Sequence, residues 1–354
     1  MASEGDLRAP VPIADVTARN AGLVRGGPRS PVKGTPERAR GSVRRTSTID
    51  SVRPDGWAGS VHVTARARDL RTDAAGAARL VAQESFTAKL SPDRVLREIV
   101  HHDARLRALL GVAVAGGFRA RAAEALAGEA ERATLLHLLV DDLPGASLVA
   151  GYALQRDPAW PAREVAFEQL RPMHDLCAGW AVDGTLFDVV RAERRIAVPA
   201  TAAVDVTEDQ DADAWHERVA TSPGSMRRAR RLDVVADQTR DGSVAFDAHF
   251  RDSHHDAAGG EGALHEYVVR GRYAPATRTL LALDAAAPVL PWVECPGALA
   301  SVPRLVGASV DDLRTRVRTD FTGTSTCTHL NDVLRSLADL PVLAAMLATD
   351  GRRD

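Results

Sequence analysis

The chain has 354 residues, of which 45% are hydrophobic and 26% charged, and its formal net charge is −2. This length and composition are typical of a globular protein with two domains, and the weak net charge argues against nucleic acid or an anionic membrane as a partner. Three cysteines, an odd number, argue against a disulfide framework and favour a reducing compartment. The sequence has neither an apolar run long enough to cross a membrane nor an apolar signal segment, so we expect a cytoplasmic protein.

The first 42 residues form the first predicted region. They are rich in Pro, Gly, Arg and Ala and show no periodicity, as in "RGGPRSPVKGTPERARGS". Such a composition predicts a disordered or loosely docked N-terminal arm. Its basic character is explained by solvation, because an arm that binds nucleic acid would carry more charge and some aromatic side chains.

The rest of the chain shows self-similarity, which predicts a tandem duplication. "SVRRTSTID" at 42–50 matches "SMRRARRLD" at 225–233, and "RARDL", "LLG" and "TLLHLL" match "HFRDS", "LVG" and "TCTHLN" in the same order. We therefore expect three regions after the arm, namely a first repeat at 43–151, a connecting segment at 152–224 and a second repeat at 225–354.

The second repeat carries thiols that the first lacks. Between the second and third matches it gains residues around "PVLPWVECPGALAS", which contains Cys295, and it has Cys327 where the first repeat has Leu135. We infer that the first repeat is a degenerate copy and that any chemistry lies mainly in the second.

Each repeat is expected to hold three strands followed by helices. Alternating apolar and polar residues predict strands at 59–70, 78–90, 94–102, 242–253, 263–273 and 277–287. Helices are predicted at 105–126, 297–307 and 309–318, around Trp215, and from about His137 and Cys327 onward, the last with an apolar stripe of Leu330, Val333, Leu334 and Leu337. The predicted fold is α+β, a tandem duplication of an antiparallel three-stranded sheet covered by helices on one face.

Three stretches resemble a known family. "GTPERARGSVRRTSTID", "VECPGALASVPRLVG" and "CTHLNDVLRSLADL" are similar to the bacterial domain-of-unknown-function family 2889, over most of the chain after residue 35. This resemblance implies no settled activity.

The order of parts in the second repeat also resembles the NifU/SufE-type iron–sulfur assembly scaffolds. Those have a three-stranded sheet, a cysteine that starts a helix, a glycine turn and a cysteine that starts a final helix, and the matching residues are Cys295, Gly307 and Cys327. The scaffold's first cysteine has no match, although His254, His255 and His265 lie nearby. In the scaffold a histidine directly precedes the last cysteine, whereas here His329 follows Cys327 by two residues.

The leading candidates for chemistry are Cys327 and His329. We expect Cys327 in the first turn of a helix that Ser325 or Thr326 caps. Unpaired backbone amides there would lower the pKa of the thiol and favour a thiolate for nucleophilic attack or metal binding. The alternative is a small buried thiol beside a core histidine, and it is supported by His137, which stands in the first repeat without a thiol.

Other residues could complete such a site. Cys295 with Cys327 and His329 would suit zinc or iron. His254 shares a strand face with Asp252, whereas His265 and Glu266 face opposite sides of their strand, so at most one of them reaches a given pocket.

The repeated Arg-Arg and Arg-Asp pairs have two interpretations. They include Arg227, Arg251 and Asp252. Such pairs either tie adjacent strands together as salt bridges or form a guanidinium fork that holds a carboxylate or phenolate substrate.

Three functions stay open at this point. The first is a small-molecule enzyme of lyase or hydrolase type, with Cys327, His329 and His254 as catalytic residues. Its substrate would be bound by Arg227, Arg251, Asp252 and His265. The second is a scaffold that holds a metal or an iron–sulfur cluster, and the third is a non-catalytic structural protein.

The expected partners follow from these functions. A divalent metal, zinc or iron, is the candidate cofactor, with Cys295, Cys327 and His329 as its ligands, and no organic cofactor is expected. The common nucleophile, phosphate-binding and zinc-protease motifs are absent from the sequence. We expect a small-molecule substrate or a metal, with no nucleic acid and no membrane, and the sequence leaves oligomer formation open.

Overall fold

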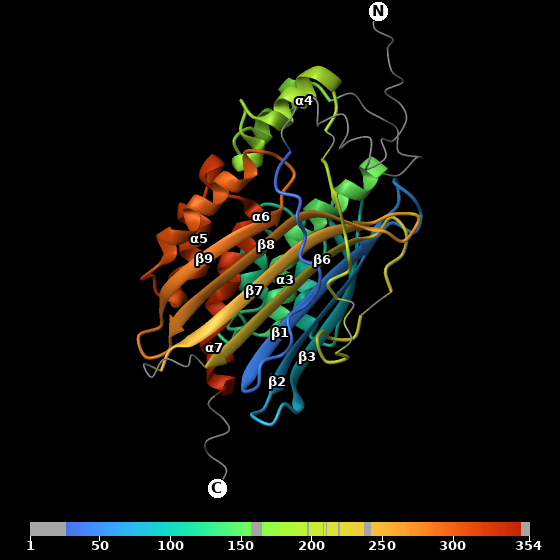
Figure 1. The fold of residues 1–354 in the computed structure, drawn as a ribbon. Coiled ribbons are helices and arrows are strands. Elements are labelled where there is room, and N and C mark those ends of the chain that lie inside the picture. Colours follow the sequence, from blue (N-terminus) through green and yellow to red (C-terminus); the bar gives the residue numbers. More distant parts are fainter. Residues whose placement is uncertain are drawn as a thin grey trace, which may run out of the picture.

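The computed structural model describes residues 26–156, 165–196, 198–207, 209, 211–218, 220–236 and 242–347. Its central feature is one antiparallel sheet that runs through both halves of the chain, with helices on one face and extended, irregular segments on the other (Figure 1). Among the described residues, no helix combines the length and the apolar character that crossing a membrane requires.

The sheet has nine strands. They are β1 Ser42–Val52, β2 Val61–Thr72, β3 Ala78–Leu90, β4 Leu96–Val100, β5 Thr201–Ala203, β6 Met226–Ala236, β7 Val244–His255, β8 Glu261–Ala274 and β9 Thr279–Val289. Their order is β4-β3-β2-β1-β6-β7-β8, and both β5 and β9 pair with β8. The two halves of the chain therefore join where β1 pairs with β6.

The helices of the first half follow its strands. They are η1 Ala104–Leu109, α2 Phe118–Ala125, α3 Leu135–Val149 and η2 Ala150–Arg156. The connecting segment forms η3 Phe167–Met173, η4 Ala178–Trp180 and α4 Thr185–Glu193. The second half forms η5 Cys295–Leu305, η6 Val310–Asp312, α5 Leu313–Asp320, η7 Gly323–Ser325, α6 Thr328–Ser336, η8 Leu337–Asp339 and α7 Leu340–Leu347. Elements marked η are 3-10 helices.

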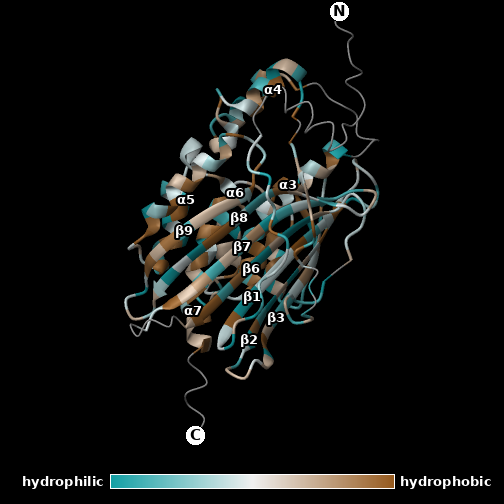
Figure 2. Ribbon diagram, in the orientation of Figure 1, coloured by the Kyte–Doolittle hydropathy of each residue, from teal (hydrophilic) through white to brown (hydrophobic). Residues whose placement is uncertain are grey.

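The α+β class is confirmed, but the expectation of three-stranded sheets is wrong. It missed three strands, the short β5 and the long β1 and β6, of which β1 and β6 lie at the centre of the sheet and are buried on both faces. β1 is rich in Arg, Thr and Ser, and β6 in Arg, so the apolar–polar alternation that reveals a half-buried strand is missing. Figure 2 shows hydrophilic residues in the middle of the sheet as well as at its ends.

Two predicted helices are also wrong. The run 105–126 breaks into η1 and α2, because Gly111 and Gly117 have φ of 81° and 86° and Ala113 forms a bridge to Val95 beside β4. The segment around Trp215 is a turn rather than a helix, and the indole nitrogen of this residue donates a hydrogen bond to Thr35.

The strand pairings of the two halves have the same register. Val61 pairs with Leu90 between β2 and β3, and Val244 pairs with Tyr273 between β7 and β8. Each residue of the second pair therefore lies 183 positions after its counterpart in the first pair (244 − 61 = 183 and 273 − 90 = 183). Each pairing also contains an irregularity directly after an aspartate, Asp69 in one half and Asp252 in the other.

The turns before the helices repeat as well. The backbone N–H of Gly111 donates to Leu96 at 2.8 Å, and that of Gly307 donates to Leu280 at 2.7 Å. These similarities give the two halves the same framework for positioning side chains on the helix-covered face.

Two apolar cores lie on the helix-covered face. The core of the first half is built from β2, β3, α2 and α3, and that of the second half from β7, β8, β9, η5 and α4 to α7. The predicted apolar stripe of α6 is confirmed, since Leu330, Val333 and Leu334 are at most 2% exposed and Leu337 is fully buried.

Ion pairs between β1 and β6 tie the two halves together. Arg44 binds Asp233 through Nε at 2.6 Å, and Arg227 binds Asp50 through Nε at 2.6 Å. Arg44 and Arg227 are at most 3% exposed, and their aspartate partners are partly buried. The interpretation of the repeated Arg residues as salt bridges between adjacent strands is therefore confirmed for these pairs.

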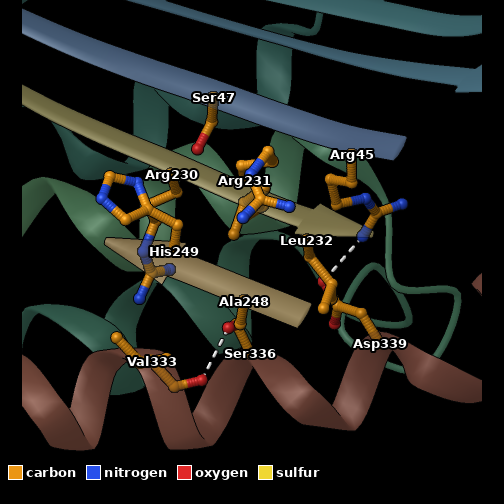
Figure 3. Close-up of a pocket in the computed structure, with 11 residues that line it drawn as sticks. Arg45, Ser47, Arg230, Arg231, Leu232, Ala248, His249, Val333, Ser336 and Asp339 are labelled. Atoms are coloured by element: carbon orange, nitrogen blue, oxygen red, sulfur yellow. Dashed lines mark hydrogen bonds and ion pairs between the residues drawn. The ribbon is translucent and has the colours of Figure 1, made fainter. Parts of the chain in front are cut away.

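A second set of ion pairs faces the helices. Arg45 of β1 binds both carboxylate oxygens of Asp69 at 2.7 Å and reaches Asp339 at 2.6 Å. Figure 3 shows Arg45 and Asp339 at the edge of a pocket of about 20 Å³ between the centre of the sheet and the helix that carries Val333 and Ser336. The helices and the sheet thus share charged contacts as well as an apolar core.

The face opposite the helices is covered by two segments far apart in the sequence. Residues 26–41 run along it, and the Thr35 hydroxyl donates to the backbone of Val206 in the connecting segment (Figure 1). Arg251 of β7 donates to the carbonyls of Val32 and Val204 at 2.6 Å each. The expectation of a disordered arm therefore does not hold for residues 26–41, and residues 1–25 lie outside the described residues.

Candidate functional site

The candidate site lies where α6 begins. Cys327 occupies the position just before the first turn of this helix and has extended backbone angles. Ser325 or Thr326 was expected to cap the helix, but Ser325 donates to Thr322 and Thr326 donates to the side chain of Asn331. Because no side-chain oxygen caps α6, the unpaired amides of its first turn lie next to the Cys327 position.

The sheet supplies a row of polar side chains opposite this helix end. Arg228, Asp252 and His265 lie side by side on β6, β7 and β8 in the strand register. Arg228 donates to both oxygens of Asp252 at 2.8 and 3.0 Å, which holds that carboxylate in place. Tyr267 stands two residues after His265 on β8 and therefore on the same face.

Cys327, His329 and Asp252 form a continuous line of polar atoms. The Sγ of Cys327 lies 3.6 Å from Nδ1 of His329, and Nε2 of His329 lies 3.5 Å from Oδ2 of Asp252. The second distance is within ion-pair range but longer than an ordinary hydrogen bond. A thiol, an imidazole and a carboxylate in this order are the parts of a nucleophile with its base and the group that orients the base.

The electrostatics of the line favour a thiolate beside a protonated imidazole. The pKa of Cys327 is held well below its usual value, first by a hydrogen bond from the Cys177 thiol and then by His329. Burial alone would lower the pKa of His329, but the contact with Cys327 and the charge of Asp252 raise it above its usual value.

Three buried polar atoms at this place lack a hydrogen-bond partner. They are Nε2 of His329, Nδ1 of His265 and the hydroxyl of Tyr267. Burial and the nearby Cys327 raise the pKa of Tyr267 far above its usual value, so this group stays a neutral phenol. Buried polar atoms are rarely left unpaired, and a group of them at one place is typical of a site that accepts a ligand or takes part in chemistry.

The other two cysteines complete a cluster of thiols. The pKa of Cys177 is raised well above its usual value by its hydrogen bond to Cys327, and burial followed by the charge of Cys327 raises that of Cys295. The three cysteines are free, and each is at most 7% exposed. The two partner thiols therefore stay protonated around one thiolate.

The η4 segment covers the thiol cluster. The backbone N–H of Ala178 donates to Thr326 at 2.9 Å, and a Cβ added at Gly179 would lie 2.5 Å from the Sγ of Cys295. This close approach requires glycine at position 179. The connecting segment thus packs closely against the residues of the thiol cluster.

Two groups of possible metal ligands are compact in the described part of the chain. The donor atoms of Asp252, His265 and His329 lie within 4.8 Å of one another, as do those of Glu84, His101 and His102. Cys295 belongs to neither group. The rings of His265 and His329 are stacked, with centroids 3.8 Å apart and planes inclined by 16°. Since an imidazole lone pair lies in the ring plane, one ring would have to rotate before both could bind the same ion.

The remaining predicted residues lie away from this line. His254 is 5.7 Å from the ring of Tyr152, and both of its ring nitrogens lack a partner. Burial lowers the pKa of His254 to about 4. Arg227 and Arg251 point to the other face of the sheet, where they pair with Asp50 and with Glu266.

The sequence prediction missed two members of the cluster. Cys177 comes from the connecting segment, and only the low number of cysteines pointed to it. Tyr267 could have been found from the period of a strand, since it shares a face with His265. Asp252 was predicted to bind substrate, whereas here it lies beside His329.

One part of the chain is similar to a known family model. No curated protein and no solved structure matches the sequence. Residues 226–343, which run from the start of β6 into α7 and include Asp252, Cys327 and His329, match the model of a family described as a protein of unknown function (DUF2889).

Proposed function

We propose that the second half of the chain is an enzyme for a small-molecule substrate, of hydrolase or lyase type, with Cys327 as its nucleophile. The observation that carries the proposal is the line from Cys327 through His329 to Asp252 at 3.6 and 3.5 Å. The pKa shifts of Cys327 and His329 have the directions that a thiolate–imidazolium pair requires.

Each group has a role in a hydrolytic reaction. The thiolate of Cys327 attacks a carbonyl carbon and forms a C–S bond, and the imidazolium of His329 gives its proton to the departing group. A water molecule that loses its proton to His329 then cleaves the C–S bond and releases the acid. Asp252 keeps the imidazole oriented, and the free amides at the start of α6 stabilise the oxyanion.

The proposal includes a movement of the cover. Cys327 is 4% exposed beneath η4, so a substrate reaches the sulfur only when the segment Cys177–Trp180 moves aside. The segment is short, and a backbone hydrogen bond from Ala178 holds it to Thr326, the residue after η7. Local opening of such a segment costs less than global unfolding.

The pH dependence of alkylation tests the proposal. The folded protein is treated with iodoacetamide between pH 5 and 9, and modification of each cysteine is followed by mass spectrometry. We expect Cys327 to react below pH 7, while Cys177 and Cys295 stay unmodified. In His329→Gln the reaction of Cys327 should shift to higher pH, whereas the control His254→Gln should leave it unchanged.

Two results would count against this enzyme. One is a Cys327 that reacts only at the alkaline pH of an ordinary thiol. The other is a Cys327 that resists alkylation for as long as the protein is folded, since a sealed sulfur cannot be a nucleophile for a substrate.

A metal site is the second candidate function. It is favoured by the compact group of Asp252, His265 and His329, a carboxylate with two imidazoles, which suits iron or zinc. The scaffold resemblance and the prediction of Cys295 as a ligand belong to this second candidate, although Cys295 is not one of the three compact donors. Purification without chelator followed by metal analysis tests it, and stoichiometric metal that disappears in His265→Gln would favour the metal site over the thiol enzyme.

We also infer that the two halves arose by tandem duplication. The equal register displacement of 183 residues in β2–β3 and β7–β8 supports this inference, as does the irregularity after Asp69 and Asp252. The same duplication accounts for Thr134, which precedes α3 as Cys327 precedes α6; by this structural match the residue that corresponds to Cys327 is Thr134, one before the Leu135 of the sequence match.

A further inference from the structure

A cleft of about 430 Å³ lies in the first half of the molecule, between β3, the start of α3 and α7. It occupies the place that corresponds to the thiol site of the second half. Glu84 corresponds in register to Tyr267 (267 − 84 = 183), and Thr134 corresponds to Cys327 as the residue before a helix. Both residues line the cleft. The shared framework thus builds a second concave place with different side chains.

The two places differ in what covers them. In the second half, η4 of the connecting segment packs over the thiols. The lining of the cleft comes from the first half together with Val342 and Met346 of α7, and no residue of the connecting segment is among the described lining residues. A small molecule can therefore reach this cleft without a movement of the chain.

One wall of the cleft holds a fixed pair, Glu84 and His101. The backbone N–H of Asp103 donates to Nδ1 of His101 at 3.0 Å, so this nitrogen carries no proton. The proton is on Nε2, which donates to Oε1 of Glu84 at 2.9 Å. The backbone N–H of Ser85 donates to the same oxygen at 2.8 Å, which leaves Oε2 of Glu84 for a ligand.

This arrangement argues against a metal ion at His101. Its only lone pair is used by the N–H of Asp103, and its other nitrogen carries a proton. His102 lies against it, with ring centroids 4.1 Å apart. A metal bound by Glu84, His101 and His102 would first have to break the contact with Asp103.

The arginines that line the cleft are paired with carboxylates other than Glu84. Arg45 is paired with Asp69 and Asp339. Arg105 is paired with Asp103 and with Glu129, which also binds Arg132. Glu84 contacts a neutral imidazole and a backbone amide, so it is left as a carboxylate without a cationic partner among the described lining residues.

The opposite wall of the cleft is apolar. It includes Ala133, Leu135, Leu136, Val342 and Met346. A single half-buried carboxylate facing an apolar wall is suited to a ligand with an ammonium head and an apolar body, because the charge-assisted bond orients the head and the wall covers the body.

We propose that this cleft binds a small organic ammonium compound, with Glu84 as its anchor and the α3–α7 wall around its apolar part. The site is separate from Cys327, and the inference does not rest on the proposed enzyme. The cleft is already formed in the structure, so binding needs little rearrangement.

Titration with phenethylammonium, followed by calorimetry on the full chain, tests the inference. We expect saturable binding that weakens about tenfold or more in Glu84→Gln, the loss of one charge-assisted hydrogen bond. The matched control is Glu98→Gln, since Glu98 lies exposed on the neighbouring strand β4 and pairs with Lys89 outside the cleft. This control should bind like the original protein.

Two comparison ligands decide between explanations. Phenylpropionate has the same apolar body with a negative head, and equal binding of this anion would overturn the proposal. The other comparison ligand is Zn²⁺. If it displaces the amine, and if its binding is lost when His102 is substituted, the cleft is a metal site and not an ammonium site. Absence of saturable phenethylammonium binding would also overturn the proposal, and circular dichroism of each variant checks that it is folded.

Discussion

At the scale of single residues, the molecule depends on arginines that are buried with several carboxylates. Arg228 is 2% exposed and contacts Asp252 at 2.8 Å, Asp332 at 2.9 Å and Asp142 at 3.3 Å. Burial opposes its charge, yet the three carboxylates raise its pKa above the ordinary value. One guanidinium therefore neutralises acidic groups from β7, α3 and α6, and its geometry fixes where these elements meet.

Removal of this arginine should destabilise the protein strongly. Arg228→Ala leaves three buried carboxylates without their shared cation, and we expect a loss of about 3–5 kcal/mol in the free energy of unfolding. Urea denaturation measures it. The control is Arg121→Ala, whose partner Glu124 is exposed and whose loss should cost less than about 1 kcal/mol. A loss at Arg228 no larger than that at Arg121 would contradict this account.

A buried histidine should make stability depend on pH. Burial, followed by the charges of Arg68 and Arg227, lowers the pKa of His216 to about 3, and its ring nitrogens contact the hydroxyls of Thr46 and Thr48. In the unfolded chain the pKa is about 6.5. The unfolded state therefore binds the extra proton first, so the contribution of His216 is fully present above pH 6.5 and is lost as the pH falls toward 3.

The variant His216→Gln isolates this contribution. Between pH 6 and 4 the stability of the original protein should fall more steeply with acidification than that of the variant, by about 1.4 kcal/mol per pH unit. Urea denaturation at several pH values gives both slopes, and equal slopes would show that His216 is protonated in the folded state.

At the scale of elements, α3 and β6 approach each other at a glycine. A Cβ added at Gly145 would collide with the guanidinium of Arg228 and lie 2.6 Å from Oδ2 of Asp332. Arg228 cannot turn aside easily, because all of its carboxylate partners are buried. The close packing of this helix on the sheet thus requires a residue that is unfavourable within a helix.

Gly145→Ala should therefore destabilise the protein although alanine favours helices. The gain in helix propensity is about 1 kcal/mol, and we expect overpacking of the ion cluster to outweigh it, with a net loss of about 2 kcal/mol. Gly116→Ala is the control, because a Cβ there meets nothing within 4 Å and its φ is not positive. Thermal unfolding measures both, and a stabilised Gly145→Ala would refute the close contact.

The sequence predicted those strands in which one face is buried and the other is more exposed. β2, β3 and β7 show this alternation, and the strand predicted at 78–90 has the observed bounds. β1 and β6 were missed because ion pairs, rather than apolar side chains, bury both of their faces. The site was predicted in part, since Cys327 and His329 are near in sequence, but Cys177 arrives from a separate segment that no local pattern places.

At the scale of the whole molecule, the two halves interlock. The halves contact each other in the sheet, where β1 pairs with β6, and again among the helices. Arg335 of α6 binds Asp141 of α3 at 2.7 Å, and Arg119 of α2 binds Asp332 of α6 at 3.0 Å. Arg45 in the first half likewise reaches Asp339 in the second. Each half thus supplies counter-charges that the other needs.

This interlocking predicts one cooperative unfolding transition for the full chain. If either half opened alone, β1 or β6 would expose a full row of unpaired backbone groups, and Arg45 and Arg228 would lose carboxylates that come from the other half. Differential scanning calorimetry should therefore show a single peak with calorimetric and van't Hoff enthalpies in a ratio of about 1. Two separate peaks, or a ratio near 2, would mean that the halves unfold independently and that the contacts between them contribute little to stability.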